Sequence, residues 1–225
     1  MYVIIVGGGE VGYYLSRELI EAGHEVLVIE PDPREVERME QELGVNTTMI
    51  GEGCRIQCLN EAGVSRADVF IAATDADENN LAACQLAMLK YKVPRVIAKL
   101  NRAHNRNIFR KLGIEHTVDL SDLLLENFKA QIPAFPFARV LTLGDVDMEV
   151  VQIRVTEDSP LVNKTIGETP LSRLAHSTCL SRMGAAPQPV SDSTRLEMGD
   201  TLVCVVARSD VEELRSHLSK IQPPV

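Results

Sequence analysis

The chain has 225 residues, of which 45% are hydrophobic and 24% charged, a composition typical of a globular, water-soluble protein. Its formal net charge of −9 argues against nucleic acid as the main partner. No apolar run approaches the roughly 18 residues of a membrane-spanning helix, and Met1 leads directly into an apolar strand, so we expect a cytoplasmic protein without a signal peptide.

A nucleotide-binding pattern begins with the first apolar run. Residues Val3–Val6 are uncharged and β-branched, which predicts a buried parallel strand, and Gly7, Gly9 and Gly12 follow at the spacing G-x-G-x-x-G. The first glycine allows a tight turn, the second lets the backbone approach a phosphate, and the third lets the next helix pack closely. That helix would direct free N–H groups and a partial positive charge at an anion.

A carboxylate follows at the distance that this pattern requires. The second apolar run, Val26–Ile29, ends at Glu30, which follows Gly12 by 18 positions. In dinucleotide-binding folds an acid roughly 20 residues on accepts hydrogen bonds from ribose hydroxyls. Its charge would repel a 2′-phosphate, which disfavours NADP. Together these features predict a bound adenine nucleotide.

Strands and helices continue to alternate along the chain. Further strands are predicted at 45–50, 68–74, 95–100 and 115–120, and helices at 10–23, 33–43, 55–62, 78–91, 108–112 and 121–132. Repeated strand–helix units predict an α/β fold in which a Rossmann-like, doubly wound parallel sheet spans residues 1–130.

The next segment, 131–144, is expected to be a crossover or hinge linker. Phe128, Phe135 and Phe137 gather at this point together with two prolines. A flexible linker would be polar, so we expect these residues to be buried, either against a second copy of the chain or against its own domain.

The remaining residues, 145–225, predict a small α+β domain. Alternating patterns favour strands at 148–155, 175–183 and 200–207, with helices near 170–174 and 210–221. Gly199 and Asp200 precede the last strand, which predicts a turn and a β-hairpin.

A basic run lies within the first domain. Eight Lys and Arg residues and no acid fall between Lys90 and Lys111. They either form a solvated surface that balances acids elsewhere, or a patch that faces phosphates or an acidic partner.

No residues present themselves for catalysis. None of the four tyrosines belongs to a Tyr-x-x-x-Lys pair, and the second domain offers only His176 and His217 as proton carriers. Cys54 and Cys58 lack a second pair at zinc-site spacing, and the five cysteines favour free thiols. We therefore expect no enzyme and no metal site. A small NAD-dependent oxidoreductase is the alternative, and a nucleotide-sensing DNA regulator would need a basic module that the chain does not show.

A more specific pattern extends through Gly51–Ala87 and Pro94–Asn101. It reads Gly-acid, Leu-x-x-Ala-Gly, Ala-Asp, Ala-Ala-Thr, acid-Glu-x-Asn and Ala-Lys-x-Asn. With the glycine motif and Glu30, it resembles the RCK domain (regulator of conductance of potassium), in particular the TrkA-type cytosolic subunits of bacterial and archaeal potassium-uptake systems. Asp158–Glu168 and Leu196–Val206 are similar to the companion C-terminal RCK domain, so the resemblance covers nearly the whole chain.

The resemblance implies a regulatory subunit that binds NAD(H) or ATP/ADP without turning it over. Such subunits form dimers that assemble into a ring and gate a membrane potassium channel or transporter, and they touch the membrane only through that partner. Residues 1–130 would be the nucleotide-binding domain and residues 145–225 the C-terminal domain.

The resemblance also implies which residues contact the nucleotide. The phosphates would be held by Gly7, Gly9, Glu10, Val11 and Gly12, and the ribose by Glu30. The adenine would lie by Gly51, Glu52 and Gly53. The far end of the nucleotide would be bordered by Thr74, Asp75 and Asn79 and reached by Lys99 and Asn101. Glu30 and Glu52 stand where the family more often has Asp, so contact distances are expected to differ.

Overall fold

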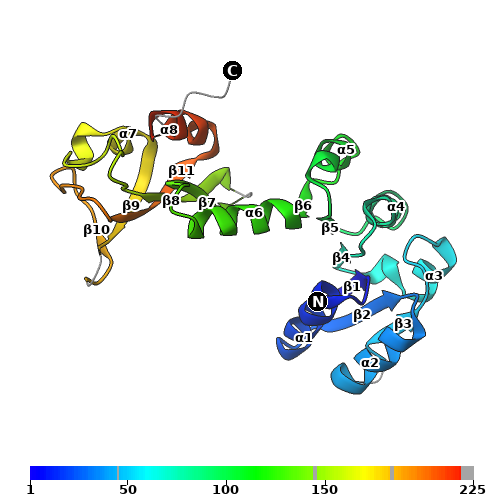
Figure 1. The fold of residues 1–225 in the computed structure, drawn as a ribbon. Coiled ribbons are helices and arrows are strands. Elements are labelled where there is room, and N and C mark those ends of the chain that lie inside the picture. Colours follow the sequence, from blue (N-terminus) through cyan, green and yellow to red (C-terminus); the bar gives the residue numbers. More distant parts are fainter. Residues whose placement is uncertain (45, 144–145, 183–184, 219–225) are drawn as a thin grey trace. The chain divides into compact units, whose positions relative to one another are not determined.

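A computed structural model describes residues 1–44, 46–143, 146–182 and 185–218. The predicted ends of elements at Val45, Met183 and Ile221 lie outside the described residues, as does the junction at 144–145. The chain divides into two compact units, Met1–Asp122 and Leu123–Val225, each with its own sheet (Figure 1).

The first unit is a parallel sheet in the order β3-β2-β1-β4-β5-β6. Its strands are β1 (Tyr2–Val6), β2 (Glu25–Glu30), β3 (Thr48–Ile50), β4 (Val69–Ala72), β5 (Arg95–Leu100) and β6 (His116–Asp119). Because the chain leaves β1 in one direction toward β3 and later returns to its other side at β4, the carboxyl ends of β1 and β4 form the switch point at which such folds bind ligands. The predicted doubly wound parallel sheet is confirmed.

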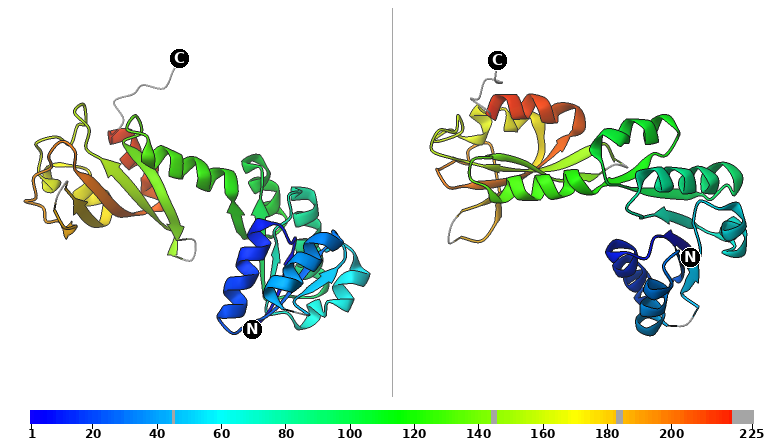
Figure 2. Two further views of the ribbon diagram at one scale, coloured as in Figure 1. Left: turned by 60° about the horizontal axis from the view of Figure 1, so that its bottom comes forward. Right: turned by 45° about the vertical axis from the view of Figure 1, so that its right-hand side comes forward.

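Helices cover both faces of this sheet (Figures 1 and 2). They are α1 (Glu10–Glu21), α2 (Pro33–Leu43), α3 (Ile56–Glu61), α4 (Asp77–Gln85) and α5 (Arg106–Lys111). The long helix predicted at 78–91 is divided, since α4 continues as a π-helical turn, Leu86–Lys90. In β1, Ile4 and Val6 face one buried cluster and Val3 and Ile5 face the other, which explains a strand without a polar position.

The second unit is an antiparallel sheet in the order β10-β9-β11-β8-β7. Its strands are β7 (Phe137–Leu143), β8 (Met148–Arg154), β9 (Ala175–Ser181), β10 (Gln188–Pro189) and β11 (Thr201–Ala207). The helices are α6 (Leu120–Gln131), which crosses the boundary between the units, α7 (Leu171–Leu174) and α8 (Val211–Leu218). Val151, Ile153, Leu202, Cys204 and Leu214 form part of one buried core. The predicted small α+β domain is therefore present.

Much of the expected linker is a strand. Phe137–Leu143 forms β7, which pairs with β8 as the edge of the second sheet. The sequence pattern did not predict this strand. Only Ala138 in it is buried and the residues from Val140 onward are exposed, so burial does not alternate along the strand in a way that the sequence could reveal. An edge strand of this kind is stabilised by its neighbour rather than by its own periodicity.

The turn predicted at Gly199 is present, but the hairpin is wrong. Gly199 has a φ of +90° and precedes β11. However, β11 pairs with β8 and β9, both distant in sequence, rather than with the segment that enters the turn.

Within the described part of the chain, no helix combines the length and the apolar character needed to cross a membrane.

Candidate nucleotide site

The turn between β1 and α1 is built from glycines that lie against backbone. Gly7 has a φ of +106°, and a Cβ there would lie 3.0 Å from the backbone nitrogen of Thr74. A Cβ on Gly12 would lie 1.9 Å from the Gly7 carbonyl oxygen, so α1 could not approach β1 as closely with any other residue. Gly9 differs, since a Cβ there would meet open space. The turn is thus closed on the protein side and open on the solvent side at Gly9.

The start of α1 can receive an anion at this opening. Gly9 is the N-cap residue, and among the described residues no side chain caps the helix there. Glu10 and Val11 follow in the first turn and are exposed. Free N–H groups and the helix dipole both favour negative charge at such a position.

Glu30 reaches the same turn from the carboxyl end of β2. One carboxylate oxygen accepts a hydrogen bond from the Gly8 N–H at 2.6 Å, and the other accepts one from the Asp32 N–H at 2.9 Å. The carboxylate is therefore held beside the glycine turn.

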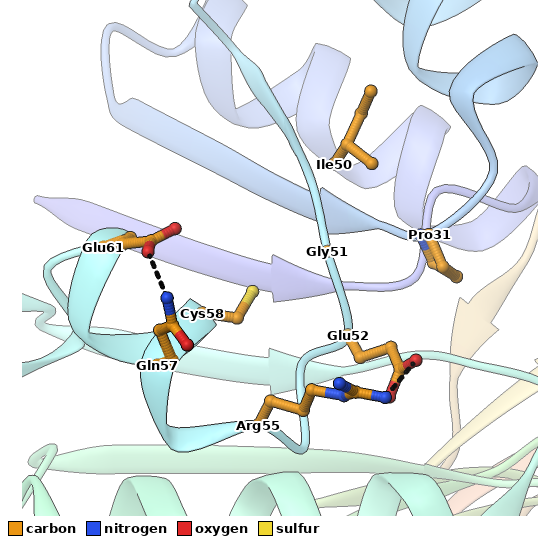
Figure 3. Close-up of a pocket in the computed structure, with 8 residues that line it drawn as sticks. All are labelled: Pro31, Ile50, Gly51, Glu52, Arg55, Gln57, Cys58 and Glu61. Atoms are coloured by element: carbon orange, nitrogen blue, oxygen red, sulfur yellow. Dashed lines mark hydrogen bonds and ion pairs between the residues drawn. The ribbon is translucent and has the colours of Figure 1, made fainter.

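A pocket of about 330 Å³ opens at the carboxyl end of β3 (Figure 3). One of its lining residues, Pro31, directly follows Glu30 in sequence. The pocket is lined by Pro31, Ile50, Gly51, Glu52, Arg55, Gln57, Cys58 and Glu61. Gly51 lies close to Cys58, since a Cβ there would lie 2.5 Å from the Cys58 sulfur, which would have to move. Gly53 is required, because a Cβ would lie 2.2 Å from the side chain of Val6. Figure 3 shows Glu52 and Arg55 paired at the Pro31 end of the pocket, with a shortest N–O distance of 2.7 Å.

At the carboxyl ends of β4 and β5, a buried asparagine ties the two strands together. The Asn80 amide oxygen accepts hydrogen bonds from the Thr74 N–H at 2.9 Å and from the Thr74 hydroxyl at 2.7 Å. Its amide nitrogen donates to the carbonyl oxygens of Thr74 and Lys99, both at 3.0 Å. Asn80 is fully buried, whereas Asn79, the residue implied by the resemblance, is exposed.

Sequence reasoning assigned the nucleotide contact to Asn79, although the motif acid-Glu-x-Asn ends at Asn80, and the helical spacing gave a second signal. Asn80 precedes the buried Ala83, Cys84 and Ala87 by three, four and seven positions, so it lies on the same face of the helix.

A second residue that sequence reasoning did not assign to the site is Asp77, the acid of the same motif and the first residue of α4. Its buried carboxylate accepts hydrogen bonds from the backbone N–H groups of Asn101 and Arg102 and from the side chains of Asn101 and Asn105. Burial opposes the charge of Asp77, but these hydrogen bonds outweigh it and lower its pKa. Asn101 is thereby fixed at the end of β5, and its amide also donates to the Thr74 carbonyl at 3.1 Å.

Lys99 and Asp75 form an ion pair at the same edge of the sheet. The Lys99 ammonium lies 2.8 Å from an Asp75 carboxylate oxygen. The Lys99 side chain is only 10% exposed, whereas that of Asp75 is fully exposed.

The basic run does not form one continuous surface. β5 divides it, so that Arg95 and Arg102 lie at opposite ends of that strand. Lys99 points to the candidate site, and Arg106 pairs with Asp119 and Asp122, both at 3.1 Å.

Comparison with known proteins matches both units. The TrkA-N domain model matches residues 3–120, and the TrkA-C domain model matches residues 150–219. A Trk system potassium uptake protein TrkA homolog from Methanothermobacter thermautotrophicus is 34% identical over 75% of this chain and 76% of its own length. The TrkA of Mycobacterium tuberculosis is 27% identical over 95% of this chain and 96% of its own.

Solved structures share the fold. The GsuK channel bound to NAD superposes with a TM-score of 0.65 at 18% identity and covers 99% of this chain. The chain spans 40% of that channel's length. GsuK bound to ADP superposes with a TM-score of 0.53 at 20% identity, over 59% of this chain and 35% of its own. The two domain matches, which fall on the two structural units, show that the chain belongs to the TrkA-type family of potassium-uptake proteins.

Proposed function

We propose that this chain is a cytoplasmic, nucleotide-sensing regulatory subunit that gates a membrane potassium channel or transporter. The observation that carries the proposal is the glycine turn open at Gly9 with the Glu30 carboxylate beside it, in a chain whose relatives are named for potassium uptake. This arrangement suits a phosphate and a ribose. Among the described residues it brings together no nucleophile and base, which favours binding over turnover.

The ligand is NAD(H) or ATP/ADP. Glu30 favours a free 2′-hydroxyl on the ribose, and the pocket beside Pro31 lies where an adenine attached to that ribose would extend. GsuK has been solved bound to NAD and bound to ADP, and that channel shares this fold.

Assembly follows from the apolar surface of α6 and β7. The two elements are neighbours, since the Glu126 carboxylate accepts a hydrogen bond from the Arg139 N–H at 2.9 Å. Phe128 is 65% exposed, Phe135 is 44% exposed, and Leu141 is 49% exposed. Only Phe137 of the three phenylalanines packs on the chain's own second core. Exposed apolar surface of this extent marks an interface, and we assign it to a second copy of the chain in a dimer that assembles further into a ring.

Gating then requires that the nucleotide bind two assembly states unequally, because a ligand shifts an equilibrium only through differential affinity. Of segment 131–144, residues 132–136 join α6 to β7 and belong to no helix or strand, and we assign them the role of hinge.

Gly9→Asp tests the proposal. The new carboxylate would occupy the open side of the turn and repel a phosphate, so nucleotides should no longer change potassium flux or raise the melting temperature. Gly9→Asn has nearly the same size without the charge and is the matched control. An unchanged nucleotide response in Gly9→Asp refutes the proposal. Steady consumption of NAD(H) in the presence of a small metabolite would instead favour the oxidoreductase.

A further inference from the structure

Lys99 is a buried cation, and its counter-ion is the carboxylate of a solvent-exposed residue. Its side chain is 10% exposed, and the carboxylate that pairs with it belongs to Asp75, which is fully exposed. Asp75 lies in the short connection between Thr74 and α4, whereas Lys99 belongs to a central strand of the sheet. The cation is therefore fixed, and the anion is held by little besides the ion pair.

The pair lies beside the phosphate turn: Asp75 follows β4, the neighbour of β1, and Lys99 lies on β5, the next strand. Gly7 is so close to the Thr74 backbone nitrogen that a Cβ would lie 3.0 Å away. Asn80 in turn bonds the carbonyl oxygens of both Thr74 and Lys99. A nucleotide with its first phosphate at Gly9 would thus extend its far end across β4 toward Lys99.

We propose that Asp75 competes with the ligand. Its carboxylate pairs with the Lys99 ammonium until the terminal phosphate of ADP or ATP takes its place. The proposal rests on the proposed nucleotide-sensing function and adds a specificity device to it. NAD(H) has the same two phosphates as ADP, but its second phosphate is esterified with a ribose. That phosphate therefore carries a single negative charge and is followed by a neutral sugar, so it leaves the pair intact. The Lys99–Asp75 pair then distinguishes polyphosphates from dinucleotides.

Charge and burial favour such an exchange. An ammonium shielded from water needs an anion beside it, so Lys99 changes partners rather than losing one. A terminal phosphate carries more charge than a carboxylate and offers three acceptor oxygens. Because Asp75 is fully exposed, water can solvate its carboxylate once it is released.

The test is a calorimetric titration of the full chain with AMP, ADP, ATP and NAD. Asp75→Asn removes the competitor, and it should tighten ADP and ATP by about fivefold while AMP and NAD change by less than about twofold, as expected for loss of an ion pair with one exposed partner. Asp75→Asn also leaves the shielded Lys99 ammonium without its counter-ion, so the free variant should melt below the original chain, and ADP or ATP should reduce that difference.

Two further variants make the result specific. Glu78→Gln removes the same charge from an exposed position three residues on and should leave all four affinities unchanged. Lys99→Met should weaken ADP and ATP most, and combining it with Asp75→Asn should abolish most of the gain, since the two residues act as a pair.

The outcomes separate the two proposals. If the chain binds none of the four nucleotides, the proposed function fails and this inference fails with it. If it binds them but Asp75→Asn tightens AMP and NAD as much as ADP, or if Glu78→Gln has the same effect, the inference alone is overturned.

Discussion

Gly12 lies so close to Gly7 that a Cβ on residue 12 would come within 1.9 Å of the Gly7 carbonyl oxygen. This contact lets α1 begin directly above the end of β1, with its N-terminus open toward solvent at Gly9.

Gly12→Ala should therefore be destabilising, because the added methyl group meets backbone that cannot rotate away. We expect a loss of about 1–3 kcal/mol in the free energy of unfolding, measured with urea. Gly9→Ala is the matched control: it adds the same methyl group to open space at a negative φ and should leave stability within about 0.5 kcal/mol. Equal effects of the two changes would contradict this account of the turn.

Asn80→Ala and Asn79→Ala should have different consequences although the residues are adjacent. Loss of the Asn80 amide leaves the Thr74 and Lys99 backbone groups without their partner, which should cost about 2–4 kcal/mol of unfolding free energy. Asn79 is exposed, and its removal should cost less than about 0.5 kcal/mol.

Nucleotide titration of Asn79→Ala then tests the residue that the family pattern implies. A lower affinity at unchanged stability would support a direct contact. Unchanged affinity would show that Asn79 makes no contact with the nucleotide. The asparagine of this motif would then act through Asn80, which joins Thr74 to Lys99.

Asp77 should make stability depend on pH in the acid range. Its pKa is lowered in the folded chain, whereas an unfolded Asp titrates near about 3.9. The unfolded state therefore binds more protons between the two values, so the stabilisation is fully present above about pH 5 and is lost as the pH falls through the folded pKa.

Asp77→Asn isolates this contribution, since the other carboxylates are common to both chains. Urea unfolding should show a gap of about 1–3 kcal/mol between them at pH 7. That gap should narrow below about pH 4. A gap of constant size from pH 3 to pH 7 would mean that the charge of Asp77 contributes nothing.

Phe128→Asp should dissociate the assembly, because it places a charge in the apolar surface of α6. We expect light scattering after size exclusion to report a smaller mass than for the original chain. Met198→Asp makes the same kind of change at an equally exposed residue, 66% against 65%, that belongs to neither α6 nor β7, and it should leave the mass unchanged. An original chain that is monomeric, or a Phe128→Asp variant of full mass, would rule out this interface.

The sequence by itself determined the class of the first unit, the glycine turn and the place of Glu30. These features depend on local order, since a buried parallel strand, a tight turn and a helix start each need particular residues at fixed spacing. The family resemblance was readable for the same reason, because its motifs are short and contiguous.

The tertiary structure alone decided which polar residues work together. Asn80 joins β4 to β5, Asp77 anchors Asn101, and Asp75 meets Lys99 across 24 positions of sequence. The strand β7 also became visible only there, because an edge strand with one buried residue takes its conformation from the ladder beside it. Partners far apart in the chain leave no periodicity in the sequence, so their meeting is fixed by the packing of the sheet.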